Sequence, residues 1–404
     1  MKQLSAFLYL FFCLTIVSNS QEVSSWRGVN SSGIYSVENL LPKWPDEGPD
    51  ILWSFNGLGQ GFSSAAFSGN KIYINGMVDG QAVLFVLDQN GKELQQFIYG
   101  KEFDTSYPGT RSTPTIVGDL AYLLTGHGKL VCLDLKSGKP VWEKDFLTNF
   151  DGINITWGYT ETILVDGDKL FCTPGGKTNN VMALNRMTGE TIWSCAGLGE
   201  LSAYCTPLLI KLPARELLVT HTAKHALGID ATTGKLLWSF EHLNQHSIHP
   251  NTPLYNDSGL FIYSVTGQGG VKLKLAPDGS SVTKEWEIQS FDNLMGGAVL
   301  IDGFIYGTGD RSPAHQCIDW KTGEQKYSST EIGKGVTIAA NKKLIGYSYK
   351  GELFMADADP SGFKVISKTK VALGTEQHWA HPVINKGNLY VRHGNTLIAY
   401  KISE

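Results

Sequence analysis

An internal repeat constrains this chain more than any other feature, because a chain built of similar units folds into similar structural units. Each unit has an apolar run ending in Asp or Asn, a short turn with Gly, and an aromatic residue four positions after that Gly. The units recur about every 40–50 residues, the spacing typical of propeller blades. The clearest copies are 128–142, 181–193 and 226–238, and weaker copies are 87–91, 274–286, 318–327 and 356–362.

Each part of the unit has a structural role. The apolar run predicts a β-strand, and the Asp or Asn side chain can accept backbone N–H groups of the turn that follows. Glycine supplies the positive φ that closes the hairpin. The aromatic residue is large enough to cover the junction with a neighbouring blade. A second hairpin precedes each unit, for example at 117–122 and 301–306, so each repeat is predicted to form a four-stranded blade.

The number of inner strands predicts an eight-bladed, all-β propeller over residues 51–404. The last repeat has only three strands, whereas an additional strand around Trp53 precedes the first repeat. Pairing these two ends would complete the last blade and remove a free sheet edge. The inner strands are expected to begin near Ser63, Ser112, Thr160, Tyr204, Asn251, Gly297, Val336 and His381.

The N-terminal segment has the pattern of a secretory signal peptide. Lys2 precedes an apolar stretch over 4–17, and Ser18 and Ser20 are small residues of the kind that signal peptidase reads. We therefore expect residues 1–20 to be removed and the protein to be exported to the periplasm or medium, with an uncleaved anchor as the alternative. Residues 21–50 are expected to form an extended arm lying across the propeller.

Composition limits the classes of partner. The formal net charge of -4 provides no basic face for nucleic acid, and the 42% of hydrophobic residues suffices for a full core. No transmembrane segment is expected after residue 20, and a monomer is expected.

Cleavage would leave five cysteines without a CxxC motif, and we interpret them as small core residues.

The repeat resembles the pyrroloquinoline-quinone-like propeller repeat of the quinoprotein superfamily. The resemblance rests on the pattern LD-x-x-[ST]-G-x-x-x-W and on Trp53 before the first blade, and it covers nearly the whole chain after residue 20. Short exported members of this superfamily include the scaffold propeller of outer-membrane barrel assembly, and long members include quinone-dependent dehydrogenases. The resemblance implies the fold. The adjacent cysteines, the CxxCH haem motif and the Glu/Asn/Asp calcium set of the dehydrogenases do not match residues here.

The loops that lead into the inner strands of a propeller gather around the central channel on one face, and here they are rich in polar and aromatic residues. Arg111 can orient an anion, Glu161 a cation, and the aromatic rings can stack a planar ring or a sugar. The alternative is an ordinary channel lined by polar groups around water. The candidate ligand-binding residues are Arg111, Trp157, Tyr159, Glu161, Tyr204, His249, Asn251, Met295, His378, Trp379 and His381.

Histidines are concentrated in two of these loops. His242, His246 and His249 lie in one segment, and His378 and His381 lie in another. If the segments meet at the channel, His249, His378 and His381 could bind Zn²⁺ or Cu²⁺ through imidazole. The spacing matches no standard metal motif, so loop histidines with ordinary hydrogen bonds are the alternative.

These observations predict an exported, non-catalytic propeller that binds protein partners or a small polar ligand through its loop face and channel, with no catalytic residues and no required cofactor. The alternative is a quinone- or metal-dependent oxidoreductase that holds pyrroloquinoline quinone and Ca²⁺, or Zn²⁺ or Cu²⁺, in the channel. Carbohydrate recognition or cleavage in the channel is a third hypothesis, supported only by the aromatic content.

Overall fold

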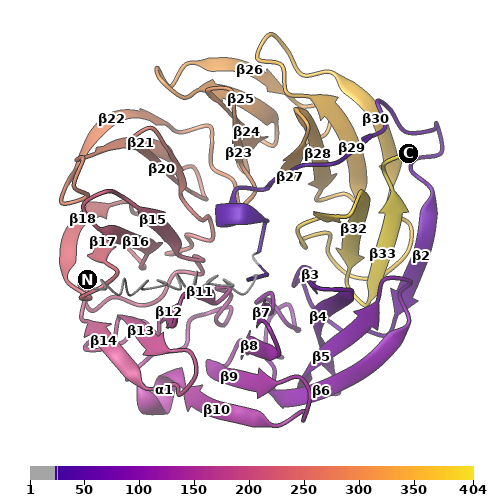
Figure 1. Cartoon of the computed structure of the whole chain (residues 1–404). Helices are drawn as coiled ribbons and strands as arrows, with labels where there is room; N and C mark the ends of the chain where they lie inside the picture. Colours follow the sequence, from indigo (N-terminus) through magenta and orange to yellow (C-terminus); the bar gives the residue numbers. More distant parts are fainter. Residues whose placement is uncertain (1–22, 25) are drawn as a thin grey trace, which may run out of the picture.

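A computed structural model describes residues 23–24 and 26–404 as a ring of eight sheets around a central channel (Figure 1). This confirms the predicted eight-bladed, all-β propeller. The inner strands begin within a few residues of the predicted positions. The predicted signal peptide, residues 1–20, lies outside the described residues.

Blades 1 to 4 follow one another along the chain, each with four antiparallel strands. Blade 1 consists of β3 (Ala66–Ser68), β4 (Lys71–Val78), β5 (Gln81–Asp88) and β6 (Glu93–Lys101). Blade 2 consists of β7 (Thr115–Val117), β8 (Leu120–Leu124), β9 (Lys129–Asp134) and β10 (Pro140–Asp145), followed by the short helix α1 (Phe146–Asn149). Blade 3 consists of β11 (Leu164–Asp166), β12 (Lys169–Cys172), β13 (Val181–Asn185) and β14 (Thr191–Cys195). Blade 4 consists of β15 (Leu208–Lys211), β16 (Glu216–His221), β17 (His225–Asp230) and β18 (Leu236–Glu241).

Blades 5 to 7 continue the series, and blade 8 combines both ends of the propeller. Blade 5 consists of β19 (Leu254–Asn256), β20 (Gly259–Ser264), β21 (Gly269–Leu275) and β22 (Val282–Ile288). Blade 6 consists of β23 (Val299–Ile301), β24 (Phe304–Thr308), β25 (His315–Asp319) and β26 (Gln325–Ser329). Blade 7 consists of β27 (Gly335–Ala340), β28 (Lys343–Ser348), β29 (Glu352–Asp357) and β30 (Val365–Lys370). Blade 8 consists of β31 (Val383–Asn385), β32 (Asn388–His393), β33 (Thr396–Lys401) and β2 (Ile51–Asn56).

The repeated Asp closes the outer hairpin of a blade as predicted. In blade 2 the Asp134 carboxylate accepts the backbone N–H groups of Lys136 at 3.1 Å and Ser137 at 2.6 Å. These bonds hold the pKa of Asp134 below its usual value. The side chains of Asn185, Asp230 and Asp319 accept the equivalent backbone bonds in blades 3, 4 and 6.

The repeated Trp fastens a blade to the next one at five of the eight junctions. In blade 3 the Trp193 indole N–H donates to the carbonyl of Ala231 in blade 4 at 3.0 Å, and its ring covers Gly234 in the same turn. A side chain on Gly234 would meet this ring, so the repeat requires Gly as well as Trp. The same indole-to-carbonyl bond recurs from Trp53 to Gln89, Trp142 to Arg186, Trp238 to Gly279 and Trp286 to Trp320.

The ring closes through its N-terminal strand. Strand β2 pairs antiparallel with β33 and completes blade 8, as the missing fourth strand predicted. Trp53 on β2 then reaches the first blade, where it bonds Gln89 and covers Gly91. The closing strand therefore provides the same blade-to-blade fastening as the strands elsewhere in the ring.

The arm that precedes β2 enters the central channel. Figure 1 shows the single-turn helix η1 (Val29–Ser31) in the middle of the ring, after which the chain runs outward. Strand β1 (Ile34–Tyr35) pairs parallel with the inner strand β27. Gly33 lies against the Arg27 guanidinium, where an added Cβ would be 2.1 Å from Nη2, so this turn needs Gly. The arm lies partly inside the propeller, and its first part occupies the middle of the channel (Figure 1).

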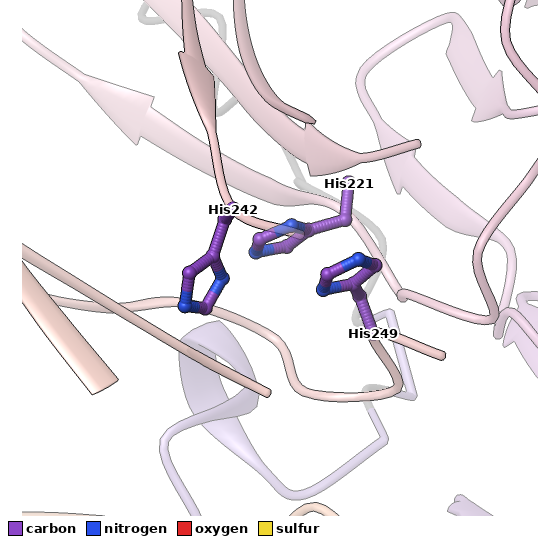
Figure 2. A group of neighbouring side chains, drawn as sticks. All are labelled: His221, His242 and His249. Carbon is purple, nitrogen blue, oxygen red and sulfur yellow. The ribbon is translucent and has the colours of Figure 1, made fainter. Parts of the chain in front are cut away.

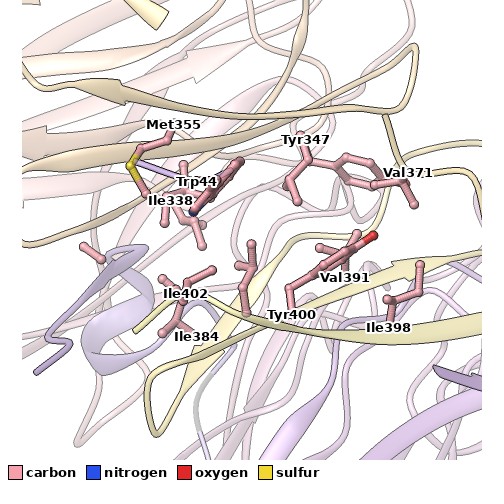
Figure 3. Packing of buried hydrophobic residues seen from close by; sticks show 14 of the residues in the cluster. Trp44, Ile338, Tyr347, Met355, Val371, Ile384, Val391, Ile398, Tyr400 and Ile402 are labelled. Carbon is pink, nitrogen blue, oxygen red and sulfur yellow. The ribbon is translucent and has the colours of Figure 1, made fainter. Parts of the chain in front are cut away.

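The outer part of the arm is anchored between blades 7 and 8. Trp44 is 1% exposed and lies in a hydrophobic cluster with Tyr347 and Met355 of blade 7 and Tyr400 and Ile402 of the C-terminal segment (Figure 3). Burying an aromatic side chain of this size contributes several kcal/mol in favour of the folded state, about 25 cal/mol per Å² of apolar surface. The arm is therefore part of the hydrophobic core.

The five cysteines of the described chain are all buried and none forms a disulfide, which agrees with their interpretation as core residues. Burial raises the pKa of Cys132 to about 11 and of Cys205 to about 12. Within the residues that the structure describes, no helix has both the length and the apolar character that crossing a membrane requires.

Candidate functional site

The arm divides the channel into two cavities at opposite ends of the inner strands. A cavity of about 350 Å³ opens among the loops that precede the inner strands. A larger one, of about 990 Å³, lies at the other ends of β11, β15 and β19, against the arm. Trp26 lines both and forms the partition between them. The smaller cavity, hereafter the channel-mouth cavity, contains most of the predicted binding residues.

The structure brings together six of the residues predicted to bind a ligand. They line the channel-mouth cavity from loops of different blades, which confirms that these loops gather on one face. These residues are Arg111, Trp157, Tyr204, Met295, Trp379 and His381.

Aromatic rings dominate the lining of the channel-mouth cavity. Trp379 is surrounded by Phe62 and Tyr107, each with ring centroids 4.8 Å from its own, and by Tyr349 at 5.8 Å. Such tilted packing is favourable between aromatic rings and holds the wall in place. Trp157 and Tyr204, with centroids 6.1 Å apart, also line the cavity. The cavity therefore presents several indole and phenol rings to a ligand.

Arg111 is the cationic side chain of the described lining, and three of its five N–H groups already have acceptors. Its guanidinium donates to the carbonyls of Ser106, Tyr107 and Gly109 at 2.7–2.8 Å. The charged group also lies 4.8 Å from the ring centroid of Phe103. Burial lowers the pKa of Arg111 to about 10. Arg111 thus shapes the loop that carries Tyr107 and contributes positive potential to the cavity.

The floor of the cavity is formed by the arm and one histidine. The Trp26 and His381 rings lie 4.8 Å apart. His381 is held between the Arg27 guanidinium, 3.0 Å from Nδ1, and the Met295 carbonyl, 2.6 Å from Nε2. Burial and the adjacent Arg27 charge lower the pKa of His381 to about 3, so this imidazole is neutral at physiological pH. Since Nε2 faces a carbonyl oxygen, it carries the proton, and Nδ1 accepts from Arg27.

Two tyrosines of the cavity have unusual backbone conformations. Tyr107 has φ of 50° and Tyr204 has φ of 74°, in the left-handed region that bulky residues seldom occupy. Each such residue costs about 1–3 kcal/mol, and such strain concentrates at binding and active sites. Both side chains line the channel-mouth cavity. The structure therefore holds two strained loop residues at the wall of this cavity.

Three other predicted residues lie in the walls behind the lining. Tyr159 donates to the Pro174 carbonyl at 2.8 Å. Asn251 donates to the carbonyls of Tyr263 and Asn293 at 3.0 and 2.8 Å, respectively. Glu161 accepts the N–H of Thr173 at 2.9 Å, and burial raises its pKa to about 8. These side chains stabilise the loops that form the cavity, and Glu161 is a neutral carboxylic acid at neutral pH.

The histidines predicted as metal ligands separate into different groups. His378 bonds the Tyr347 hydroxyl and stacks on His393 with centroids 3.8 Å apart, whereas His381 belongs to the cavity floor. His249 instead lies with His221 and His242 in a buried cluster (Figure 2). The prediction placed His249 with His378 and His381 at the channel. In the structure the His249 side chain lies beside His221 and His242, which belong to or directly follow strands of blade 4.

Sequence reasoning missed two kinds of residue at these sites. Trp26 was recognised as part of the arm, but nothing in its surroundings placed it in the channel. Phe62 and Tyr349 also line the cavity. Phe62 lies just before the inner strand β3 and Tyr349 just after β28, and these positions in the repeat could have indicated that both face the channel mouth. His221 ends the apolar strand β16, and its position in a strand concealed it.

The lining does not fit the quinone and calcium that the superfamily resemblance implies. Ca²⁺ requires several oxygen ligands, usually with carboxylates among them. Among the described residues that line the channel-mouth cavity, none is Asp or Glu. Pyrroloquinoline quinone carries carboxylates of its own, and three of the five N–H groups of Arg111 already bond backbone carbonyls.

Comparison with solved structures agrees with the fold. The chain superimposes on the crystal structure of BamB from Moraxella catarrhalis with a TM-score of 0.61 and 13% identity, over 87% of this chain and 99% of that one. A europium-containing methanol dehydrogenase superimposes with a TM-score of 0.66 and 14% identity, over 90% and 88%. At these identities the likeness concerns the fold alone.

Sequence comparison identifies the family. An uncharacterized protein of Rickettsia conorii is 27% identical over 272 residues, 61% of this chain and 61% of that protein. The outer membrane protein assembly factor BamB of Kangiella koreensis is 25% identical over 139 residues, 34% of this chain and 32% of the relative. These matches span less than two thirds of the relatives' length. Residues 50–329, more than half of the chain, match the family model described as outer membrane protein assembly factor BamB. The chain therefore belongs to the BamB family of pyrroloquinoline-quinone-like β-propellers.

Proposed function

We propose that this protein is an exported, monomeric, non-catalytic propeller that binds a partner protein by enclosing one of its aromatic or large aliphatic side chains in the channel-mouth cavity. The observation that carries the proposal is the ring of aromatic side chains around that cavity. Trp and Tyr are the residues that contribute most often to binding energy at protein interfaces. A cavity of about 350 Å³ has room for one such anchor with its flanking backbone.

The walls of the cavity favour binding without large rearrangement. Trp379 is held by three neighbouring rings, and Arg111 is fixed by three carbonyls of its own loop. A preorganised site loses little side-chain entropy when it binds, which increases affinity. Tyr107 is 47% exposed and stands at the rim, where it can contact the partner outside the cavity.

The family supports a partner of this class. Its description as an outer membrane protein assembly factor concerns proteins that act in association with other proteins. The signal-peptide pattern in residues 1–20 supports export. A chemical reaction finds less support, because His381 is held neutral between two partners and the described lining offers no carboxylate.

Selection from a random peptide library displayed on phage tests this proposal. The immobilised protein should enrich peptides with Trp, Tyr, Phe or Leu anchors, and a synthetic peptide from the selection should change the tryptophan fluorescence of the protein. Trp379→Ala should weaken its binding at least tenfold, because removing a buried aromatic contact costs about 2 kcal/mol or more. Tyr255→Ala, an aromatic truncation in the opposite cavity, is the matched control and should bind as the unmodified protein does.

Three results would contradict the proposal. One is a library selection without aromatic or aliphatic enrichment. Another is peptide binding that Tyr255→Ala weakens and Trp379→Ala leaves intact. The third is dye-linked oxidation of alcohols or sugars that depends on added pyrroloquinoline quinone and Ca²⁺, which would establish the oxidoreductase alternative.

A further inference from the structure

Three histidines form a buried cluster beside the channel, separate from the lining of the channel-mouth cavity. His221 ends β16, His242 follows β18, and His249 lies in the loop that leads to β19. Their side chains point toward one another from these three segments (Figure 2). The exposed fractions are 1%, 1% and 0%, and the potential ligand nitrogens all lie within 4.8 Å of one another.

The cluster leaves polar atoms without partners. Both ring nitrogens of His221 and Nδ1 of His249 are buried and have no hydrogen-bond partner, and the buried His242 ring has only the Gly269 backbone as a polar neighbour. A buried polar group without a partner is unfavourable, and most such groups in native proteins are satisfied by protein, water or an ion. One ion would take one nitrogen from each of the three histidines, so three poorly satisfied rings at one place indicate a missing ligand.

The hydrogen bonds around His249 orient its free nitrogen toward the cluster. The Asn244 amide donates to the Ile248 carbonyl and to Ser264 Oγ, both at 2.7 Å, which uses both of its hydrogens. The nearby Nε2 of His249 therefore carries the proton and donates to the Ala223 carbonyl at 3.2 Å. Nδ1 is left with an unprotonated lone pair. A backbone carbonyl that fixes a tautomer in this way is a common feature of metal-binding histidines.

Protons do not compete for these lone pairs at neutral pH. Burial lowers the pKa of His242 to about 4 and that of His249 to about 3, and burial with the two neighbouring histidines lowers the pKa of His221 well below its usual value. Neutral imidazole is the form that binds a metal.

We propose that His221, His242 and His249 form a binding site for one divalent transition-metal ion, with Zn²⁺ as the representative of the class. Imidazole ligands suit Zn²⁺ and Cu²⁺, whereas Ca²⁺ and Mg²⁺ require oxygen. Three protein ligands leave a fourth tetrahedral position for water. This site goes beyond the proposed partner binding and does not depend on it.

Binding requires a small movement of the rings. With metal–nitrogen bonds of about 2.0–2.1 Å, tetrahedral ligand nitrogens lie about 3.3 Å apart. The His221 and His249 rings are stacked, with centroids 4.9 Å apart and an interplanar angle of 4°. Rotation of the imidazoles brings their lone pairs to a common point, and the cluster then contracts around the ion.

The ion would also stabilise one wall of the channel-mouth cavity. Ile248 and Pro250, on either side of His249, both line that cavity. A bond from His249 to an ion held by two segments of blade 4 would fix this loop. The expected role of the metal is therefore structural, and a bound ion should raise the melting temperature.

The experiment uses untagged protein, freed of metal with EDTA and dialysed, and titrated with Zn²⁺ by calorimetry. One ion per chain is expected, with a rise in melting temperature. His249→Ala and His242→Gln should each weaken binding more than about tenfold. His246→Ala removes a histidine of the same loop that is not in the cluster, so it is the matched control and should retain the unmodified affinity.

A spectroscopic measurement keeps the proposal testable if the variants do not fold. One equivalent of Cu²⁺ added to the unmodified protein should give an electron paramagnetic resonance signal with hyperfine coupling to imidazole nitrogens. Absence of stoichiometric binding, a signal without nitrogen ligation, or undiminished binding by a folded His249→Ala variant would each overturn the proposal. Loss of binding in His378→Gln alone would also overturn it, because the stacked pair of His378 and His393 would then be the site.

Discussion

The contact between Trp193 of one blade and Gly234 of the next allows a quantitative test of how the ring is held together. Trp193 is 7% exposed and donates to the Ala231 carbonyl. Trp193→Ala should lower the free energy of unfolding by about 3–5 kcal/mol. Gly234 has φ of 76°, and an added Cβ would lie 2.7 Å from Trp193 Cε3. Gly234→Ala should therefore cost about 1–2 kcal/mol for its backbone conformation and about 1–3 kcal/mol for displacing the ring.

The double variant separates these two costs. Without the indole, the alanine at position 234 meets no ring, so only the backbone cost remains. The double variant should then be about 1–3 kcal/mol more stable than the sum of the two single effects predicts. The assay is urea unfolding followed by circular dichroism, with midpoints compared at a constant m-value.

A matched glycine controls for the backbone cost. Gly80 has φ of 74°, and a Cβ added there meets nothing within 4 Å. Gly80→Ala should cost only the backbone term and should add to Trp193→Ala without coupling. Additivity of Trp193→Ala and Gly234→Ala within about 0.5 kcal/mol would refute the reasoning, because it would show that the ring does not depend on the glycine.

Two further predictions concern the buried groups Arg27 and Glu161, and a third concerns Tyr107 at the rim of the cavity. Arg27→Met should leave the carbonyls of Ala298 and Thr337 without their donor, lower stability by about 1–3 kcal/mol and speed proteolysis of the arm, whereas Lys43→Met on the exposed arm should not. Glu161 takes up a proton on folding because its pKa rises from 4.5 to about 8, so stability should fall as pH increases through that window. Glu161→Gln should flatten that fall in urea titrations at several pH values, whereas Glu143→Gln at an exposed position should leave it unchanged. Tyr107→Ala should weaken peptide binding and lower stability only slightly, since an exposed side chain at the rim has fewer contacts to lose than one in a buried wall; an increase in affinity would contradict its place at the rim.

The blades could be predicted from the sequence because their determinants are local. Asp134, its turn and Trp142 lie within one hairpin, and this short pattern recurs along the chain. The strand around Trp53 could be assigned to blade 8 because a closed ring requires equal blades. The gathering of Arg111, Trp157, Tyr204 and Trp379 then followed from propeller topology.

The remaining features depend on contacts between distant parts of the chain. Arg27 meets the Thr337 carbonyl, 310 residues away, and no periodicity marks the segment that contains it. Likewise, the Glu161 side chain points into the wall because it accepts the backbone N–H of Thr173, and the sequence gives no indication of this contact. His221 could not be joined to His249 because a histidine in a strand gives no indication of which neighbour it faces.

Hydrogen exchange with and without a saturating selected peptide tests the central claim most directly. The account predicts new protection in the loops of the channel-mouth cavity, around residues 104–111, 157–160 and 378–381, and none at β11, β15 or β19 beside the opposite cavity. Protection confined to those inner-strand ends, or to the outer strands of the blades, would contradict the claim that this protein binds its partner at the channel mouth.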